Sequence, residues 1–244
     1  MASVSRTASF ASSHGSTNPS YAGVAIGANG GNDVIYLAFG GRSTSSVTAV
    51  TGITVDGVAA TQIIDQDTGN TTANIAAIFA IARNSLPDPT QTDVDIAITY
   101  DQSVLRTGGE VYVSGDASAT PTHTNFEAID GLFSTNQTLD GNVNTVLDGI
   151  VIAYAVEGAT SAATPPTNAW TGATEDTDGQ FAGSSTVRST AHASGVAAAT
   201  PRTVQCVVTK NGTTDIASPL LVVASFPPAA APAGAPRSFA AVMG

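Results

Sequence analysis

Carboxylates are the side chains of this sequence that come closest to a catalytic set. Glycosidases place two carboxyl groups on either side of a sugar, and only their separation in space matters. Four glutamates could supply such a pair: Glu110, Glu127, Glu157 and Glu175. Clefts that cleave sugars usually also carry aromatic platforms, and the chain has one tryptophan and five tyrosines. We therefore expect Trp170 to fill the edge of a core, with stacking on a sugar as the alternative.

Two aspartate-rich runs place oxygen ligands at alternate positions, as calcium loops do. They are residues 65–70 (DQDTGN) and 176–179 (DTDG). Neither run completes the order of ligands of an EF-hand loop, and neither is followed by the distal glutamate that such a loop requires. We expect ordinary acidic turns, with no metal and no cofactor.

Cys206 is the only cysteine, so it cannot form a disulfide within the chain. It lies between Val204 and Val208 on one face of an expected strand, which favours a buried thiol. A nucleophilic cysteine would need a nearby base, and none of the three histidines is close to it in the sequence. No nucleophile elbow, phosphate-binding loop, dinucleotide fingerprint or paired Cys/His spacing is present. We therefore predict no catalytic residues and a protein that is not an enzyme.

The composition excludes further classes of function. Only 11% of the residues are charged, against about 25% in ordinary globular domains. The net charge is -11 and the eight basic residues are scattered, which argues against nucleic acid as a partner. The first ten residues lack the apolar segment of a signal peptide. No apolar run approaches the length of about 18 residues that spans a membrane, so we expect no membrane partner.

The hydrophobic pattern indicates an all-β fold. Residues 33–39 are apolar on both faces, as in a strand covered on both sides, whereas residues 94–100 alternate as in a half-exposed strand. The alanines of residues 73–83 favour a helix, but this run is short and bounded by turn formers, so we predict a strand. Residues 29–32 (NGGN) and 56–57 (DG) predict hairpin turns.

The first strand is predicted from strict alternation. Val4, Arg6, Ala8 and Phe10 alternate with small polar residues, so these four side chains should share one face of a half-buried strand. Asp93 and Asp95 follow the same rule further along and should be ordinary solubilising charges on a solvent face.

A faint internal duplication organises the chain. Residues 33–39 correspond to 149–156, residues 94–100 to the strand that begins at Val204, and residues 110–114 to 219–226, with an offset of roughly 110 residues. We predict one antiparallel β-sandwich domain over residues 1–226, jelly-roll-like, with half-repeats at 24–115 and 148–226. We favour one main sandwich, with residues 122–146 as an elaboration of it.

The last residues have a composition of their own. Residues 227–236 alternate between proline, alanine and glycine, which predicts an extended arm of largely polyproline II conformation over 227–244. It ends in a short apolar segment, and we expect Phe239, Val242 and Met243 to dock on a neighbouring subunit. A linker without a partner is the alternative.

Four stretches of the chain resemble a β-sandwich that recurs in structural proteins of tailed bacteriophages: residues 33–39, 55–61, 170–175 and 221–226. The resemblance covers residues 3–226 and brings no catalytic residues with it. It implies a part of a virion that is not an enzyme and lies on the exterior surface. It also implies a homo-oligomer, with a trimer as one expected state, made in the host cytoplasm.

Within that resemblance, a capsid decoration (cement) or head-fibre protein is the first expectation, and its partner would be the major capsid protein. A low-charge surface of Ala, Ser, Thr and Gly supports this, because few long side chains must be immobilised when it packs against a neighbour. A tail or baseplate component is the near alternative. A carbohydrate- or receptor-binding module of the virion, with a host-surface glycan as partner, stays open as a different class.

Overall fold

The structure of the protein is a computed structural model that describes residues 1–12, 16–43, 49–69, 73–181 and 184–230. The first half of the chain contains β1 (Ser5–Ser12), β2 (Ser20–Ala25), β3 (Val34–Arg42), β4 (Val50–Val55), β5 (Val58–Ala59), β6 (Thr61–Asp67), β7 (Asn74–Ala82), the 3-10 turn η1 (Arg83–Ser85), β8 (Asp93–Tyr100) and β9 (Arg106–Ser114). The second half contains β10 (His123–Ala128), β11 (Leu132–Phe133), β12 (Gln137–Asp140), β13 (Val143–Thr145), β14 (Gly149–Ala159), β15 (Thr167–Thr171), β16 (Thr174–Gln180), β17 (Thr186–Val196), β18 (Ala199–Arg202), β19 (Gln205–Thr209) and β20 (Ile216–Phe226).

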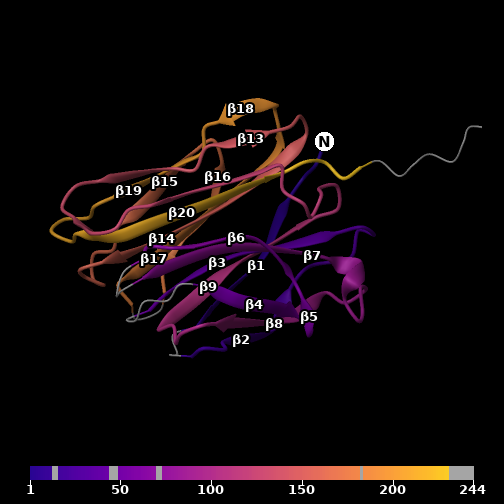
Figure 1. Ribbon diagram of the computed structural model, residues 1–244, viewed down its shortest axis with the longest axis horizontal. Coiled ribbons are helices and arrows are strands. Elements are labelled where there is room, and N and C mark those ends of the chain that lie inside the picture. Colours follow the sequence, from indigo (N-terminus) through magenta and orange to yellow (C-terminus); the bar gives the residue numbers. More distant parts are fainter. Residues whose placement is uncertain (13–15, 44–48, 70–72, 182–183, 231–244) are drawn as a thin grey trace, which may run out of the picture.

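These strands form four stacked layers (Figure 1). The first outer sheet has the order β2-β8-β4-β5, and the first inner sheet has the order β1-β9-β3-β7-β6. The second inner sheet follows with the order β10-β20-β14-β17-β16, and β11 also pairs with β20. The second outer sheet, β12-β19-β15, closes the stack, with the pair β13-β18 beside it. The predicted all-β, antiparallel sandwich class is confirmed.

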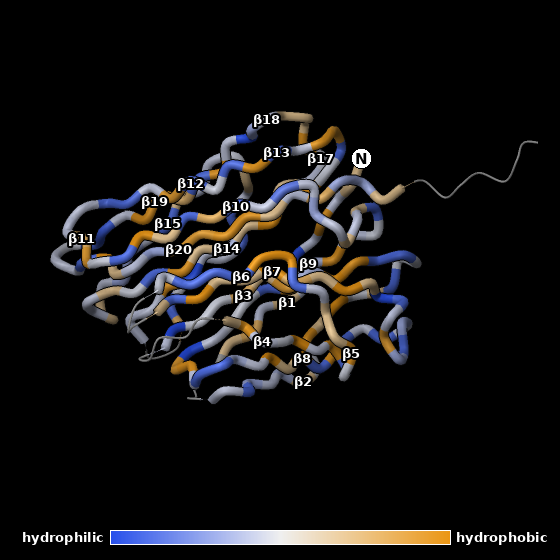
Figure 2. Tube along the Cα trace, in the orientation of Figure 1, coloured by the Kyte–Doolittle hydropathy of each residue, from blue (hydrophilic) through white to orange (hydrophobic). Residues whose placement is uncertain are grey.

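Three apolar cores hold the layers together, and Figure 2 shows hydrophobic residues along the strands of the inner sheets. The first lies between the outer and inner sheets of the first half and contains Leu37, Phe39 and Ile98. The second lies between the two inner sheets. The third, between the inner and outer sheets of the second half, contains Ala153 and Cys206. Each inner sheet is therefore covered on both of its faces.

Double coverage explains which strands read as continuous apolar runs. β3, β7, β14 and β20 all lie inside an inner sheet and are buried along nearly their whole length. β7 confirms the strand predicted at residues 73–83 in spite of its alanines. β8 lies in an outer sheet and alternates between exposed and buried residues, with Asp93 and Asp95 on the exposed face as predicted.

The duplication is visible in the strand order. The first inner sheet, β1-β9-β3-β7-β6, matches the second, β10-β20-β14-β17-β16, strand for strand. The outer sheets match in the same way, with β2-β8-β4 against β12-β19-β15. By this match β3 is equivalent to β14, β8 to β19 and β9 to β20, which are the three correspondences that the sequence predicts.

Two details of the predicted organisation are wrong. The expected single main sandwich is two sandwiches stacked on each other through their inner sheets. Residues 122–146 are not an elaboration, because β10 and β12 are edge strands of the second sandwich. The sequence hides this role, since edge strands are half-exposed and carry few apolar residues.

The two predicted hairpin turns had different outcomes. Asp56 and Gly57 connect β4 to β5 with positive φ angles of 48° and 79°, as a two-residue hairpin turn requires. Residues 29–32 do not close a hairpin, because β2 pairs with β8 while β3 pairs with β7 and β9. This turn instead carries the chain from the outer to the inner sheet.

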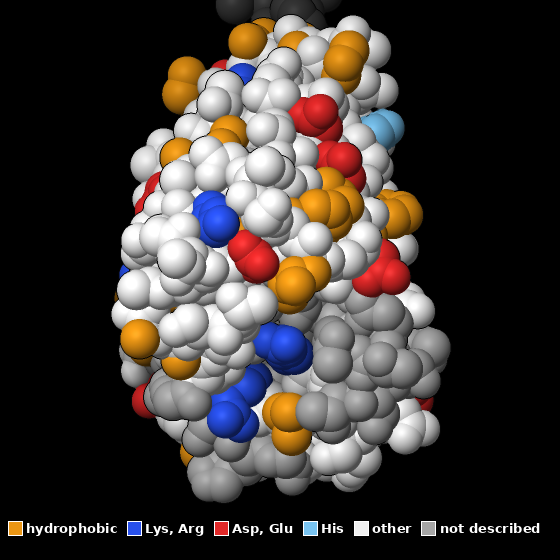
Figure 3. Space-filling view, turned by 90° about the vertical axis from the view of Figure 1, so that its left-hand side faces the viewer, with side chains coloured by type: hydrophobic (Ala, Val, Ile, Leu, Met, Phe, Trp, Pro, Cys, Tyr) orange, Lys and Arg blue, Asp and Glu red, His pale blue; other side chains and the backbone are white. Residues whose placement is uncertain are grey.

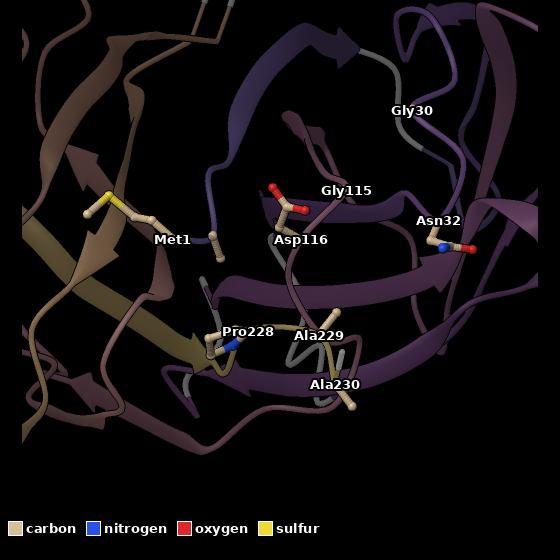
Figure 4. A pocket seen from close by; sticks show the side chains of 9 residues that line it. Met1, Gly30, Asn32, Gly115, Asp116, Pro228, Ala229 and Ala230 are labelled. Atoms are coloured by element: carbon tan, nitrogen blue, oxygen red, sulfur yellow. The ribbon is translucent and has the colours of Figure 1, made fainter. Parts of the chain in front are cut away.

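Both ends of the described chain lie at the border between the halves. At the N-terminus, the amide of Ala2 donates to the carbonyl of Asp148, and Ala2 accepts from the amide of Gly195, each at 2.9 Å. At the other end, Pro227 accepts from Ser118 at 2.9 Å. A cavity of about 470 Å³ lies between these segments (Figure 4).

Candidate functional site

Charged side chains gather on one side of the contact between the two inner sheets, which we call the junction. Glu110 on β9 has a fully buried carboxylate, which accepts from Nε of Arg6 at 2.5 Å. The guanidinium of Arg188 on β17 lies 3.6 Å from the same carboxylate, between Nη2 and Oε1. The hydrogen bond to Glu110 raises the pKa of Arg6 above its ordinary value. One carboxylate thus joins both halves of the chain.

Arg188 is bound by more than Glu110. Its Nη1 donates to the backbone carbonyls of Phe10 and Gly109 at 3.0 and 3.1 Å. Its guanidinium also lies over the ring of Phe181, 5.5 Å from the centroid. A single arginine of the second half therefore contacts two strands of the first half.

A second polar group lies beside the first and is built in the same way. The hydroxyl of Tyr112 on β9 donates to Asp176 at 2.8 Å, and Nδ1 of His192 on β17 lies 2.8 Å from the same carboxylate. Burial raises the pKa of Tyr112, and the carboxylate of Asp176 adds to that effect. Asp176 thus connects the two halves with the charge arrangement reversed, because here the second half supplies the carboxylate.

Two β-bulges in edge strands direct Arg6 and Asp176 toward the junction. The pairing of β1 with β9 shifts register between Arg6 and Ala8, so Arg6 faces the junction while Ala8 and Phe10 face the first core. Simple alternation would have placed these three and Val4 on one face, and that prediction is wrong because Val4 lies in the second core. A bulge between Glu175 and Thr177 likewise makes Asp176 the extra residue of β16. Bulges commonly redirect a side chain in this way.

The bulge of β16 has a counterpart in β6, and together they show which residues of the two halves are equivalent. β6 carries its bulge opposite Ile78, which pairs with Ala38 of β3. β16 carries its bulge opposite Thr190, which pairs with Tyr154 of β14. Ala38 is therefore equivalent to Tyr154, and the ladders extend this equivalence to the neighbouring strands.

This alignment shows that equivalent strands face each other on the two sides of the junction, although β20 lies closer to β7 than β9 does to β17 and the side chains differ. On one side β9 faces β17, and on the other side β20 faces β7. The polar residues of the first side correspond to smaller or apolar ones on the second: Arg6 to Thr124, Glu110 to Val222, Tyr112 to Ala224, Asp176 to Ile63, Arg188 to Ala76, Thr190 to Ile78 and His192 to Ala80. The junction thus has a polar side and an apolar side.

A third buried polar group lies away from the junction, in the third core. Glu157 accepts from the side-chain amide of Asn168 at 2.9 Å, and the same amide donates to Asp178 at 2.9 Å. The thiol of Cys206 donates to the side-chain oxygen Oδ1 of Asn168 at 3.3 Å. Burial raises the pKa of Glu157 to about 8, with Asp178 adding to the rise. At neutral pH this carboxyl group is therefore mostly protonated.

The predicted site residues are dispersed rather than assembled. Glu110 faces the junction, and Glu157 faces the third core on the other side of the second inner sheet. Burial raises the pKa of the Cys206 thiol well above its usual range, which is the inert state that we predicted. Asp176 and Asp178 bind partners on opposite faces of β16, so they do not share a site. Phe239, Val242 and Met243 lie outside the described residues.

Trp170 and the tyrosines are used inside the protein. The indole of Trp170 donates to the hydroxyl of Ser189 at 2.8 Å and packs against the third core, as predicted. Four of the five tyrosines are buried: Tyr36, Tyr100, Tyr112 and Tyr154. Tyr21 packs against the first core. None of these rings forms an exposed platform for a sugar.

Sequence reasoning missed Arg6, Tyr112, Arg188 and His192. The usable signal was a comparison of the halves, since β17 has polar residues where β7 has alanine and isoleucine. Within the described ranges, no three His, Cys, Asp or Glu side chains are grouped so that they could hold a metal ion. In the same ranges, no helix has the length and apolar character to cross a membrane. No protein-family model, curated protein or solved structure matches the chain.

Proposed function

We propose that the chain is a structural protein of a virion, a capsid decoration (cement) or head-fibre protein that binds and stabilises the shell of a tailed phage. It acts by its shape and surface and carries out no reaction. The resemblance of its strand segments to phage structural proteins is the starting point. The location of the polar side chains supports the proposal independently.

The observation that carries the proposal is the low charge of the surface, because only 11% of the residues are charged and five charged side chains of the described part are buried. Among the described residues, Arg83 is fully buried and bound to Asp33, and Arg188 is bound within the junction. Glu110 and Glu157 are also fully buried. What is left for the surface is mainly uncharged, as Figure 3 shows for one face. A surface of this kind loses little side-chain entropy on packing against a large neighbour.

The four-layer stack supports the same role. Three apolar cores fill the spaces between the four layers, so packing is continuous from one outer sheet to the other. A protein that reinforces a shell needs such a rigid body, because most of its binding free energy would otherwise be spent on ordering it. Tail or baseplate components share this requirement and remain the near alternative.

The C-terminal arm belongs to the proposal. β20 ends at Phe226, and Pro227 to Ala230 lie along the segment between the halves, where the amide of Ala229 donates to the carbonyl of Asp116. We propose that Phe239, Val242 and Met243 dock on a neighbouring subunit. A truncation after Ala230 keeps the described contacts and removes residues 231–244, which include all three of these side chains.

The test uses shells of the phage that encodes the chain, with this protein deleted. Shells without it should release DNA at a lower temperature, and addition of the purified protein should restore retention. The protein truncated after Ala230 should bind more weakly to the same shells. If shells that lack this protein retained their DNA to the same temperature as complete shells, the proposal would be overturned.

A further inference from the structure

Each inner sheet has a face at the junction that could in principle pack against the same face of a second molecule. Each face carries five equivalent strands in the same order, and the facing pairs, β9 with β17 and β20 with β7, exchange equivalent strands as a two-fold arrangement would. In such a geometry, the first inner sheet of one molecule could pack on the first inner sheet of another. The apolar residues at the centre of the junction do not prevent this, because both faces supply them.

We infer that the polar side of the junction is a pairing code that makes the first half accept the second half and reject a second copy of the first. The two halves place complementary groups on opposite strands. β9 of the first half carries Glu110 and Tyr112, and the second half supplies Arg188 and Asp176 as their partners.

Pairing between two first halves would break both contacts. By the two-fold arrangement, β9 would then face β7 of the other copy, which offers Ala76, Ile78 and Ala80 at the equivalent positions. Glu110 would keep Arg6 but would face Ala76 in place of Arg188, and Tyr112 would lose Asp176. The mismatch would occur twice, because both sides of the pair would have it. A buried carboxylate that loses one of its two arginines and a buried hydroxyl that loses its acceptor both destabilise the wrong pair.

Pairing between two second halves fails for the complementary reason. β17 would face β20 of the other copy, and Arg188 would lie over Val222 instead of Glu110. Only a first half against a second half places polar groups on polar groups and apolar groups on apolar groups. The code therefore works by leaving buried polar groups unpartnered in the wrong pairs as well as by attraction in the right one.

The code can be tested by making the polar side a copy of the apolar side. The seven-site variant is R6T, E110V, Y112A, D176I, R188A, T190I and H192A, each taken from the equivalent position. A protease site is inserted after the exposed Thr120, so that the full chain can be cut between the halves. The cut protein is unfolded in urea, refolded and weighed by native mass spectrometry.

Wild-type protein should give only species with equal numbers of the two fragments. The seven-site variant should also give pairs of two first halves and pairs of two second halves. Equal numbers in the variant, or like pairs in the wild type, would overturn the inference. This outcome is independent of the shell experiment, because it concerns the pairing of halves and not the binding of a shell.

A second measurement covers a variant whose fragments fail to refold. The intact chain, without the protease site, is refolded at rising concentration and its mass is followed by light scattering. The seven-site variant should form assemblies larger than those of the wild type, and their share should rise several-fold with concentration. A mass distribution identical to that of the wild type would contradict the code. A matched control, Glu175→Gln on the exposed edge of β16, should leave the distribution unchanged.

Discussion

Arg188 of the second half lies 3.6 Å from the buried carboxylate of Glu110 in the first half, and this contact crosses a span of 78 residues in the sequence. The pair lies where the two inner sheets meet. Glu110 has no exposed side-chain surface, so its charge depends on its partners. The two halves are thus joined by an ion pair as well as by an apolar core.

Loss of the Glu110 charge should destabilise the whole protein. In Glu110→Gln, the guanidinium of Arg188 stays buried without its carboxylate, and breaking such a pair costs about 3–5 kcal/mol. Urea unfolding measures this loss. Glu175→Gln removes the same charge from an exposed edge and should change the free energy of unfolding by less than about 0.5 kcal/mol. Equal effects of the two variants would contradict a role for the junction.

The buried carboxyl group of Glu157 should make stability depend on pH. Its pKa is about 8 in the folded protein against an ordinary value of 4.5, so the folded state holds this proton more tightly than the unfolded state. The free energy of unfolding should therefore fall as pH rises from about 4.5 to about 8 and then level off. Between pH 6 and 9 the loss should be on the order of 3 kcal/mol.

Glu157→Gln isolates this effect. Glutamine keeps the size and can still accept from Asn168, but it has no proton to lose. Urea unfolding of the variant at pH 6 and pH 9 should show a much smaller difference than the wild type. The same fall with pH in both proteins would show that another group is responsible.

Gly40 makes room for Tyr154 at the centre of the junction. A Cβ atom on Gly40 would lie 2.5 Å from the ring of Tyr154, whose hydroxyl donates to the carbonyl of Gly108 at 2.8 Å. Gly40→Ala should therefore cost about 1–3 kcal/mol through overpacking. Gly52→Ala is the control, since its Cβ would meet nothing within 4 Å. Thermal unfolding should show a lower Tm for the first variant only.

Cys206 should be chemically silent in the folded protein. Its thiol is fully buried and its pKa is raised by burial, and the thiolate is the reactive form. A thiol reagent at pH 8 should label the native protein on the order of a hundredfold more slowly than the urea-unfolded protein, because burial keeps the thiolate from forming and from meeting the reagent. Comparable labelling rates would mean that the third core opens readily.

A strand could be predicted from the sequence wherever its burial produces a local pattern of apolar and polar residues. β3 and β14 are continuous apolar runs because other sheets cover both of their faces, and β8 alternates because only one of its faces is covered. The two-sandwich stack was not predictable in this way, since nothing within β10 or β12 records which sheet it joins. It depends on pairing between strands that are up to about a hundred residues apart.

The junction was missed for a more specific reason. Arg6 and Asp176 reach it only because bulges displace them from simple alternation. Their partners Glu110 and Tyr112 are 104 and 64 residues away in the sequence. The sequence does contain polar residues at alternate positions of β17, but their meaning appears only once β17 is compared with β7.

The most direct test of the junction is whether the two halves unfold together. Trp170 is the only tryptophan and lies in the second outer sheet, so its fluorescence reports the second half while far-UV circular dichroism reports both. In urea, the wild type should give one transition with the same midpoint by both signals. Glu110→Val should separate the two midpoints. A wild-type protein that already unfolds in two separate steps would contradict the account of one body joined through Glu110 and Arg188.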